Sequence, residues 1–265
     1  SFRPFADSFS INDWTNKSNE PPLHFAGSFG RFMVWVRNMR ISYPRLEIYP
    51  IDDDVAGAFR HVKVNPNLVA MHSYTSSGVL CMATGQTFGD CVSPPNWEPL
   101  AMARQQYARY LWAYPSTIER VAEYLPKLTL APCPTQEEIA MFVQATPDTK
   151  HQGVIDKAGN RLPPQYDHHV DDNLYADIAQ HRTQTISESV LSRYEICGYP
   201  SPTQPDPLSR EKFESNFTHC RKEVGFLVDT RRMSIALPQY KKDQLVELLL
   251  TWKEKATFTL LDAAE

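Results

Sequence analysis

The sequence predicts an α+β fold in which helices pack on one face of an antiparallel sheet. Short apolar runs of strand length are interleaved with longer segments of helical periodicity, and several strand runs are joined by short polar turns. The chain has 265 residues, of which 42% are hydrophobic and 22% charged. This is ordinary globular composition, sufficient for one large domain or two modest ones.

The first half of the chain carries the clearest strand and hairpin signals. Residues 46–51 (LEIYPI) predict a buried strand that runs into three aspartates. Residues 68–83 predict two strands joined at Ser76–Gly78, since serine and glycine favour a tight turn. The remaining predictions are an extended lead-in over 1–27, a helix or strand over 29–36, and helices over 97–112 and 116–125.

The second half ends in the most regular helix pattern of the chain. Leu245, Leu248, Leu249 and Trp252 recur at helical spacing and predict one apolar face. In chain order this half predicts a polar connection over 129–165 with a short helix at 135–144, a strand over 166–175, a helix over 174–194, a Pro-rich loop over 198–209, a helix start at 209–214, a hairpin of 224–228 with 233–237, and a helix over 239–255.

Composition excludes several classes of protein. Five cysteines without a CxxC spacing argue against a structural zinc site or a disulfide framework. No apolar run is long enough for a transmembrane helix, so we expect no membrane partner and an intracellular protein. The net charge of −4 argues against nucleic-acid binding over the whole surface, although local basic patches matter more than the total.

Two acidic clusters carry the chemistry. Asp52–Asp54 follow the 46–51 strand, and Asp171–Asp172 lie within the segment HVDD at 169–172. Each cluster alone is more often a solvated polar junction. Together they supply one aspartate from an early strand and two from a later hairpin, which is what two-metal nucleotidyl transfer requires. We therefore expect the carboxylates of Asp54, Asp171 and Asp172 to converge within several ångströms.

The segment DDDVAGAFRHVKVNP, residues 52–66, resembles the first palm motif of reverse transcriptases. This resemblance implies that Asp54 binds metal, that Val55 contacts the nucleotide, and that Phe59 rejects a ribose 2′-hydroxyl. QTFGDCVSPPNW, residues 86–97, is similar to the second motif of that family, in which Phe88 and Gly89 would line the nucleotide pocket. The match is closest to retroelement enzymes of the long-terminal-repeat or tyrosine-recombinase type.

Two later segments extend the resemblance. HVDD is similar to the family's aromatic-x-Asp-Asp box, with His169 in place of the aromatic residue, and it implies that Asp171 and Asp172 are catalytic metal ligands. EVGFLVDTRRMSIALP, residues 223–238, resembles the primer-grip hairpin, with Gly225 and Phe226 carrying the match. The resemblance further implies a nucleotide-binding lysine that protonates pyrophosphate, either Lys212 or Lys222, of which Lys212 is preferred.

The resemblance implies a polymerase palm with partial fingers and the start of a thumb. The function implied is template-directed DNA synthesis with Mg²⁺, or Mn²⁺ as the alternative ion, on an RNA or DNA template with primer and deoxynucleoside triphosphates. RNase H or other retroelement domains would lie outside this sequence. Two alternatives remain open: an inactive reverse-transcriptase-like scaffold that binds nucleic acid or supports assembly, and an unrelated metal-dependent hydrolase. The implied segments are a lead-in with partial fingers over 1–45, a palm over 46–222 with the 129–165 insertion, the primer-grip hairpin over 223–238, and the start of a thumb over 239–265.

Overall fold

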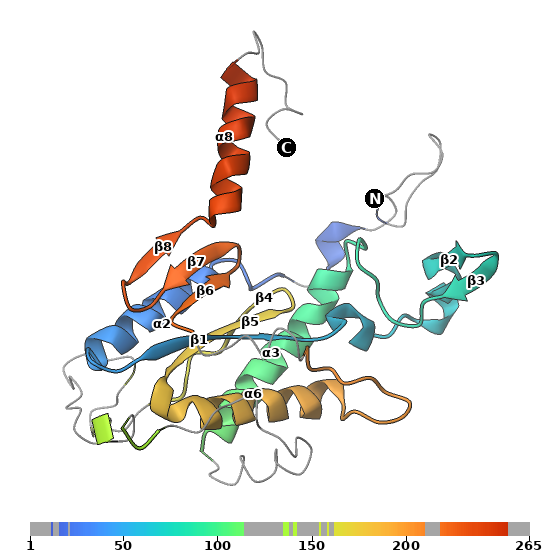
Figure 1. The fold of residues 1–265 in the computed structure, drawn as a ribbon. Coiled ribbons are helices and arrows are strands. Elements are labelled where there is room, and N and C mark those ends of the chain that lie inside the picture. The colour runs from blue at the N-terminus through green and yellow to red at the C-terminus, as the bar shows by residue number, and fades with distance from the viewer. Residues whose placement is uncertain are drawn as a thin grey trace.

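The computed structural model describes residues 16–20, 22–113, 162–209 and 218–253, with isolated positions at 12, 135–137, 140, 141, 154 and 158. The described part is a mixture of helices and antiparallel sheets (Figure 1). The longer helices are α2 (Ser28–Ser42), α3 (Ser93–Leu111), α6 (Arg182–Cys197) and α8 (Gln239–Lys253). Short 3₁₀ helices are η1 (Lys17–Asn19), η2 (Ala58–His61), η3 (Pro66–His72) and η5 (Ala179–His181).

A three-stranded antiparallel sheet lies at the centre of the fold. Its strands are β1 (Ile48–Asp54), β5 (Asp172–Ile178) and β4 (Asp167–His169), in the order β1-β5-β4. In the β1–β5 register Asp54 lies directly opposite Asp172, and in the β4–β5 register His169 lies opposite Asp172. The central strand β5 is buried from Asn173 to Ile178. A strand buried along both faces needs a cover on each side.

Helices cover both faces of this sheet, which corrects the expectation of helices on one face. On one side, α3 and α6 pack against Ile51 and Tyr175. On the other side, α2 packs against Leu174, Ala176 and Ile178, since alternate side chains of a strand point to opposite faces. The indole of Trp35 on α2 donates a hydrogen bond to the carbonyl of Ala176 at 2.9 Å. Residues 28–42 are therefore part of the sheet's packing.

A two-stranded hairpin projects from the side of the molecule, formed by β2 (Ser73–Ser76) and β3 (Val79–Met82) (Figure 1). The predicted turn is confirmed: Ser77 and Gly78 both have positive φ, 49° and 77°, as a type I′ hairpin turn requires. Residues 66–72, however, form η3, so only the latter part of the predicted 68–83 segment is strand.

A second three-stranded sheet connects to the last helix. Its strands β6 (Cys220–Glu223), β7 (Phe226–Asp229) and β8 (Ser234–Ala236) are paired in chain order. Val224 was expected within a strand but lies in the β6–β7 turn with Gly225, both at positive φ. From β8 the chain enters α8, which extends away from both sheets (Figure 1). None of the residues of α8 is fully buried: of its apolar face, Leu248 and Trp252 are half-buried and Leu245 and Leu249 are exposed.

Other sequence predictions hold with shifted boundaries. The helix expected from 97 begins at Ser93, with proline near its start, where a missing N–H costs nothing. The helix expected over 174–194 was wrong at its start: β5 continues to Ile178, because it pairs with β1 along its whole length, and α6 begins at Arg182. The helices expected over 116–125 and 209–214, and most of that over 135–144, lie outside the described residues. Within the described part of the chain, no helix combines the length and apolarity needed to cross a membrane.

Candidate metal centre

The end of β1 and the β4–β5 hairpin bring the predicted aspartates together. Residues directly opposite in an antiparallel pair project from the same face, so Asp54 and Asp172 share one side of the sheet. It is the face that α2 covers further along, at Leu174 and Ala176. Asp54 and Asp172 stand at the end of that face where both side chains remain half-buried.

The hairpin turn places Asp171 beside its neighbour. In a regular strand Asp171 and Asp172 would point to opposite faces, but Asp171 lies in the two-residue turn between β4 and β5. Val170, the other turn residue, has φ 60°. A β-branched residue in this left-handed region is strained by about 1–3 kcal/mol. Trp97 of α3 holds the strained turn, because its indole donates a hydrogen bond of 2.9 Å to the carbonyl of Val170.

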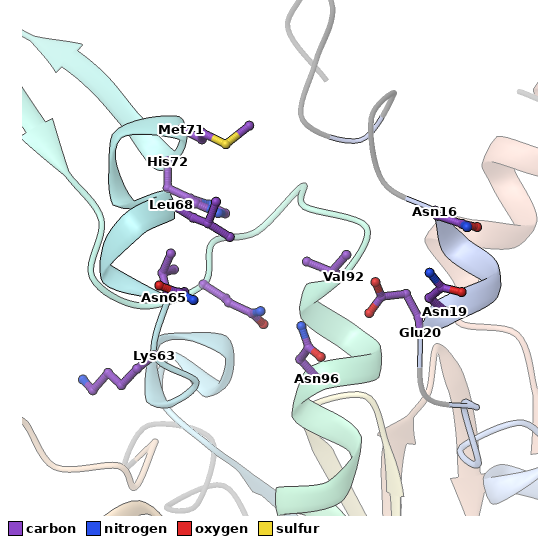
Figure 2. Close-up of a pocket in the computed structure, with 12 residues that line it drawn as sticks. Asn16, Asn19, Glu20, Lys63, Asn65, Leu68, Met71, His72, Val92 and Asn96 are labelled. Atoms are coloured by element: carbon purple, nitrogen blue, oxygen red, sulfur yellow. The ribbon is translucent and has the colours of Figure 1, made fainter.

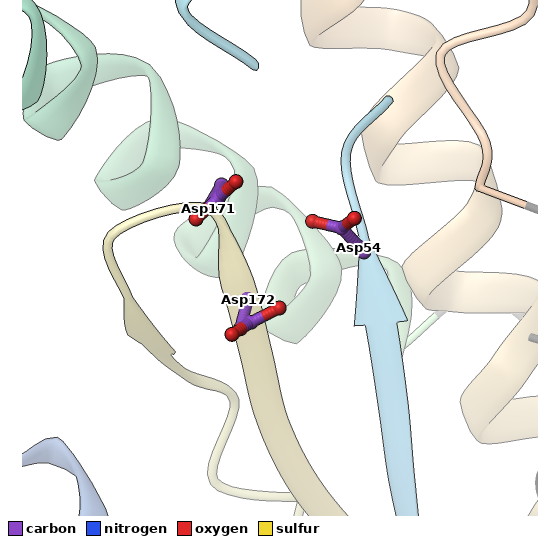
Figure 3. A group of neighbouring side chains, drawn as sticks. All are labelled: Asp54, Asp171 and Asp172. Atoms are coloured by element: carbon purple, nitrogen blue, oxygen red, sulfur yellow. The ribbon is translucent and has the colours of Figure 1, made fainter. Parts of the chain in front are cut away.

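The expected convergence of Asp54, Asp171 and Asp172 is confirmed. One carboxylate oxygen from each lies within 4.8 Å of the other two, and all three residues are half-buried (Figure 3). Carboxylate oxygens are the ligands that Mg²⁺ prefers, at about 2.0–2.1 Å. Two ligands on opposite sides of such an ion are about 4 Å apart, so small side-chain movements would let these oxygens share an ion. The donor set therefore fits a divalent cation, which would also offset the mutual repulsion of the carboxylates.

Asp53 has a separate, structural role. Its side chain is fully buried on the opposite face of β1 from Asp54. It forms ion pairs with Arg193 of α6 and with Arg104 of α3, the latter at 3.6 Å, and accepts hydrogen bonds from Ser189 and Tyr175. Burial lowers the pKa of Arg104 to about 10, so its guanidinium remains charged at neutral pH. Asp53 thus links β1 to both helices beneath the metal centre.

The histidines beside the hairpin pair with other groups. His168 is buried, with Nε2 3.0 Å from a carboxylate oxygen of Glu98 on α3. His169 packs edge-on against the ring of Phe25, with centroids 5.2 Å apart. Within the described residues, the aspartate trio is the cluster with metal-ligand spacing, and neither histidine belongs to it. Both histidines are therefore polar residues of β4 held by contacts outside the aspartate cluster.

The residues expected to bind the nucleotide lie after β1 and before α3. Val55 is buried and pairs with Leu208 in an isolated β-bridge. Phe59 lies in η2, is 4% exposed, and packs against Phe88 with ring centroids 4.9 Å apart. Phe88 itself is 63% exposed, and Gly89 has φ 91°, a conformation that favours glycine. Lys212 lies outside the described residues.

The expected primer-grip residues lie in a different sheet. Gly225 occupies the β6–β7 turn, where an added Cβ would lie 2.6 Å from Nζ of Lys241 near the start of α8. Phe226 begins β7 and stacks on Phe29 of α2, with centroids 5.2 Å apart. The hairpin tip is therefore in contact with both α2 and α8, and the role of Gly225 and Phe226 toward a primer stays a prediction.

The sequence analysis did not identify the two buried arginines that pair with Asp53 on the face of β1 opposite the metal centre. Arg104 occupies the buried face of α3 together with Ala101, Ala108 and Leu111, at helical spacing. Arg193 lies within a run of buried residues on α6. An arginine at an apolar position of a helix is rarely buried unless it is paired, and this signal would have pointed to a buried carboxylate partner.

Comparison with known proteins adds little. No family model matches the chain, and no curated protein matches it. Among solved structures, the chain is similar to a foamy viral protease-reverse transcriptase in complex with RNA/DNA hybrid, with 13% sequence identity and a TM-score of 0.40. The alignment covers 85% of this chain and 21% of that chain, so this chain spans about a fifth of the length of that protein.

Proposed function

We propose that this chain is a reverse transcriptase core that extends a primer on an RNA or DNA template by two-metal nucleotidyl transfer. The convergence of Asp54, Asp171 and Asp172 within 4.8 Å is the observation that carries the proposal. One carboxylate comes from the end of β1 and two from the β4–β5 hairpin, as the sequence resemblance requires. Polymerases of this kind need about three carboxylates from separate strands.

The three aspartates would hold Mg²⁺, or Mn²⁺ in its place. When bound, two such ions would activate the 3′-hydroxyl of the primer and neutralise the charge of the triphosphate. The chain's own contribution is positioning: Trp97 fixes the turn that carries Asp171, and the buried Asp53 ion pairs tie the end of β1 to α3 and α6. Carboxylates held by such a rigid frame need not reorganise during the reaction, which lowers the barrier.

Phe59 and Phe88 would select the sugar of the nucleotide. Phe59 lies in η2, the 3₁₀ helix that follows the end of β1 at Asp54, and its ring packs against the ring of Phe88. A ring fixed in this way beneath the sugar would clash with a ribose 2′-hydroxyl. The resemblance to the first palm motif implies this role, and the packing supplies the rigidity that it needs.

We predict that Phe59→Val raises incorporation of ribonucleotides relative to deoxynucleotides by about tenfold or more. Valine is smaller than phenylalanine, so the 2′-hydroxyl gains room, and it keeps more of the buried packing than alanine would. The measurement is primer extension with each nucleotide type at matched concentrations. Leu100→Val, a comparable truncation of a partly buried side chain packed in the same cluster, is the control. An active variant with the parent's deoxy-over-ribo ratio would refute the role of Phe59.

Primer extension by the unmodified chain tests the proposal itself. A labelled primer annealed to RNA or DNA template should be extended in the presence of Mg²⁺ or Mn²⁺ and left unextended with EDTA. Absence of extension, together with an unchanged melting temperature on adding either ion, would contradict catalysis. Binding of primer–template without extension or metal response would instead favour the inactive scaffold.

A further inference from the structure

The loop that leads into α3 is held by a residue from near the start of the chain. Asn12 donates a hydrogen bond from Nδ2 to the carbonyl of Gly89 at 2.7 Å, and its Oδ1 accepts one from the amide of Cys91 at 2.8 Å. These two partners fix which end of the carboxamide is donor and which is acceptor, because a carbonyl only accepts and an amide N–H only donates. Among the described residues, neither backbone atom has a backbone partner, so Asn12 supplies the bonds that a neighbouring strand would otherwise make.

The residues that flank this pair of bonds are anchored separately. Asp90 is buried, and its Oδ2 lies 3.7 Å from Nδ1 of His72. The hydroxyl of Ser93 donates a hydrogen bond to the carbonyl of Thr87 at 2.8 Å. The two residues between these anchors are the ones that the sequence predicts to line the nucleotide pocket.

These two residues, Phe88 and Gly89, have little packing of their own to hold them. Phe88 is 63% exposed, and its described ring contact is with Phe59. Gly89 has φ 91°, and among the described residues nothing beyond its chain neighbours lies within 4 Å of the position that a Cβ would take. Glycine has more conformational freedom to lose than any other residue, so its backbone needs an anchor to keep one conformation. The bonds to Asn12 provide that anchor.

The N-terminal region meets α3 at a second point, beyond a cavity. The amide of His24 donates a hydrogen bond of 2.8 Å to Oε1 of Glu98, which is 2% exposed. Residues 16–20, which lie between the two attachments in the sequence, line a cavity of about 520 Å³ together with Val92 and Asn96 of α3 (Figure 2). Since the region faces a cavity here, its attachment depends on discrete hydrogen bonds, and removing one should loosen the loop without unfolding the core.

We infer that Asn12 is a positioning residue for the incoming nucleotide. It acts through Gly89, whose backbone carries the ring of Phe88 into contact with Phe59. The inference rests on the proposed function, because Phe88 and Gly89 face a nucleotide only if the chain is a polymerase. It gives the N-terminal region a role in the site that its polar sequence does not suggest.

Amide hydrogen exchange tests this anchor without nucleotide or metal. Asn12→Leu nearly keeps the size of the side chain and removes both bonds, so the amide of Cys91 should exchange about tenfold faster, while the amides of α3 keep the parent's protection. Asn12→Asp keeps the acceptor for Cys91 and loses the donor to Gly89, so it should show a smaller increase. Asn16→Ala is the matched control: it removes a carboxamide of the same region that accepts hydrogen bonds from Ser18, and exchange at Cys91 should stay unchanged.

Nucleotide affinity shows whether the anchor serves the site. On a primer that lacks its 3′-hydroxyl, a deoxynucleotide can bind without turnover, so affinity is measured separately from catalysis. We expect Asn12→Leu to weaken this binding by about tenfold and to raise the KM for deoxynucleotide by a similar factor, with the KM for primer–template unchanged. A purely structural role would lower the fraction of active protein, and therefore kcat, and would leave the KM for nucleotide at the parent's value.

The two measurements separate this inference from the proposed function. Unchanged exchange of the Cys91 amide in Asn12→Leu, or nucleotide affinity equal to the parent's, would overturn the role of Asn12. A parent that binds nucleotide without extending a primer would contradict catalysis, and the positioning role would still be supported if Asn12→Leu weakens that binding. A parent that binds no nucleotide would overturn both.

Discussion

Replacing Asp171 by asparagine should lower the rate of primer extension by a factor on the order of 10² or more. The change removes one negative charge from the carboxylate trio and nearly preserves the shape of the side chain. A loss of this size is typical when an electrostatic contact to the transition state is removed. Primer extension by parent and variant at saturating Mg²⁺ measures it directly.

The same variant should separate stability from catalysis. Without divalent ions, Asp171→Asn should melt at the parent's temperature or above it, since three converging carboxylates repel one another. Added Mg²⁺ or Mn²⁺ should raise the melting temperature of the parent more than that of the variant. Asp243→Asn, the same chemical change on the exposed α8, should match the parent in both measurements. A variant that extends primers at the parent's rate would remove Asp171 from the site.

Replacing Asp53 by asparagine should destabilise the fold by about 3–5 kcal/mol, although Asp53 directly precedes a predicted metal ligand. The substitution leaves two buried guanidiniums, of Arg104 and Arg193, without their shared negative partner. Exposed fractions of 2% or less for all three side chains mean that water cannot compensate for the loss. Urea unfolding followed by circular dichroism measures the free energy of unfolding.

Two comparisons make the Asp53 result interpretable. Asp54→Asn, one residue further along β1, should leave the free energy of unfolding unchanged or higher and should lose activity instead. Asp243→Asn on the exposed surface should change it by no more than about 0.5 kcal/mol. If Asp53→Asn unfolds at the same urea concentration as the parent, the buried ion pairs do not stabilise the fold as inferred.

Much of the centre was predictable because it depends on local pattern. The run LEIYPI predicts a buried strand by composition, and two adjacent aspartates can reach one metal only if the backbone turns there. The turn itself divides the predicted 166–175 strand into β4 and β5. The apolar spacing of α3 and α8 likewise predicts helices irrespective of what they contact. These features are set by periods of two and 3.6 residues, which a single sequence displays.

The remainder depends on contacts between distant residues. The start of α6 was misplaced because the sequence around Tyr175–Ile178 suits a helix as well as a strand, and pairing with β1 decides it. Alternation along the strand predicts that Asp53 and Asp54 point to opposite faces of the sheet. Which of the two side chains is buried in ion pairs is decided by the packing of α3 and α6, which the sequence does not show. The cover of α2 on the second face of the sheet also arises from packing that no local pattern reveals.

The bond between Trp97 and the hairpin gives the protein an internal optical reporter. The indole is 1% exposed, and its N–H points to the carbonyl of the residue that precedes Asp171. Emission from a shielded indole is sensitive to its hydrogen bond and to nearby charge. We expect an event that draws the aspartates together to act on this turn, so in a variant that keeps Trp97 as its single tryptophan the fluorescence should report on the centre without an added dye.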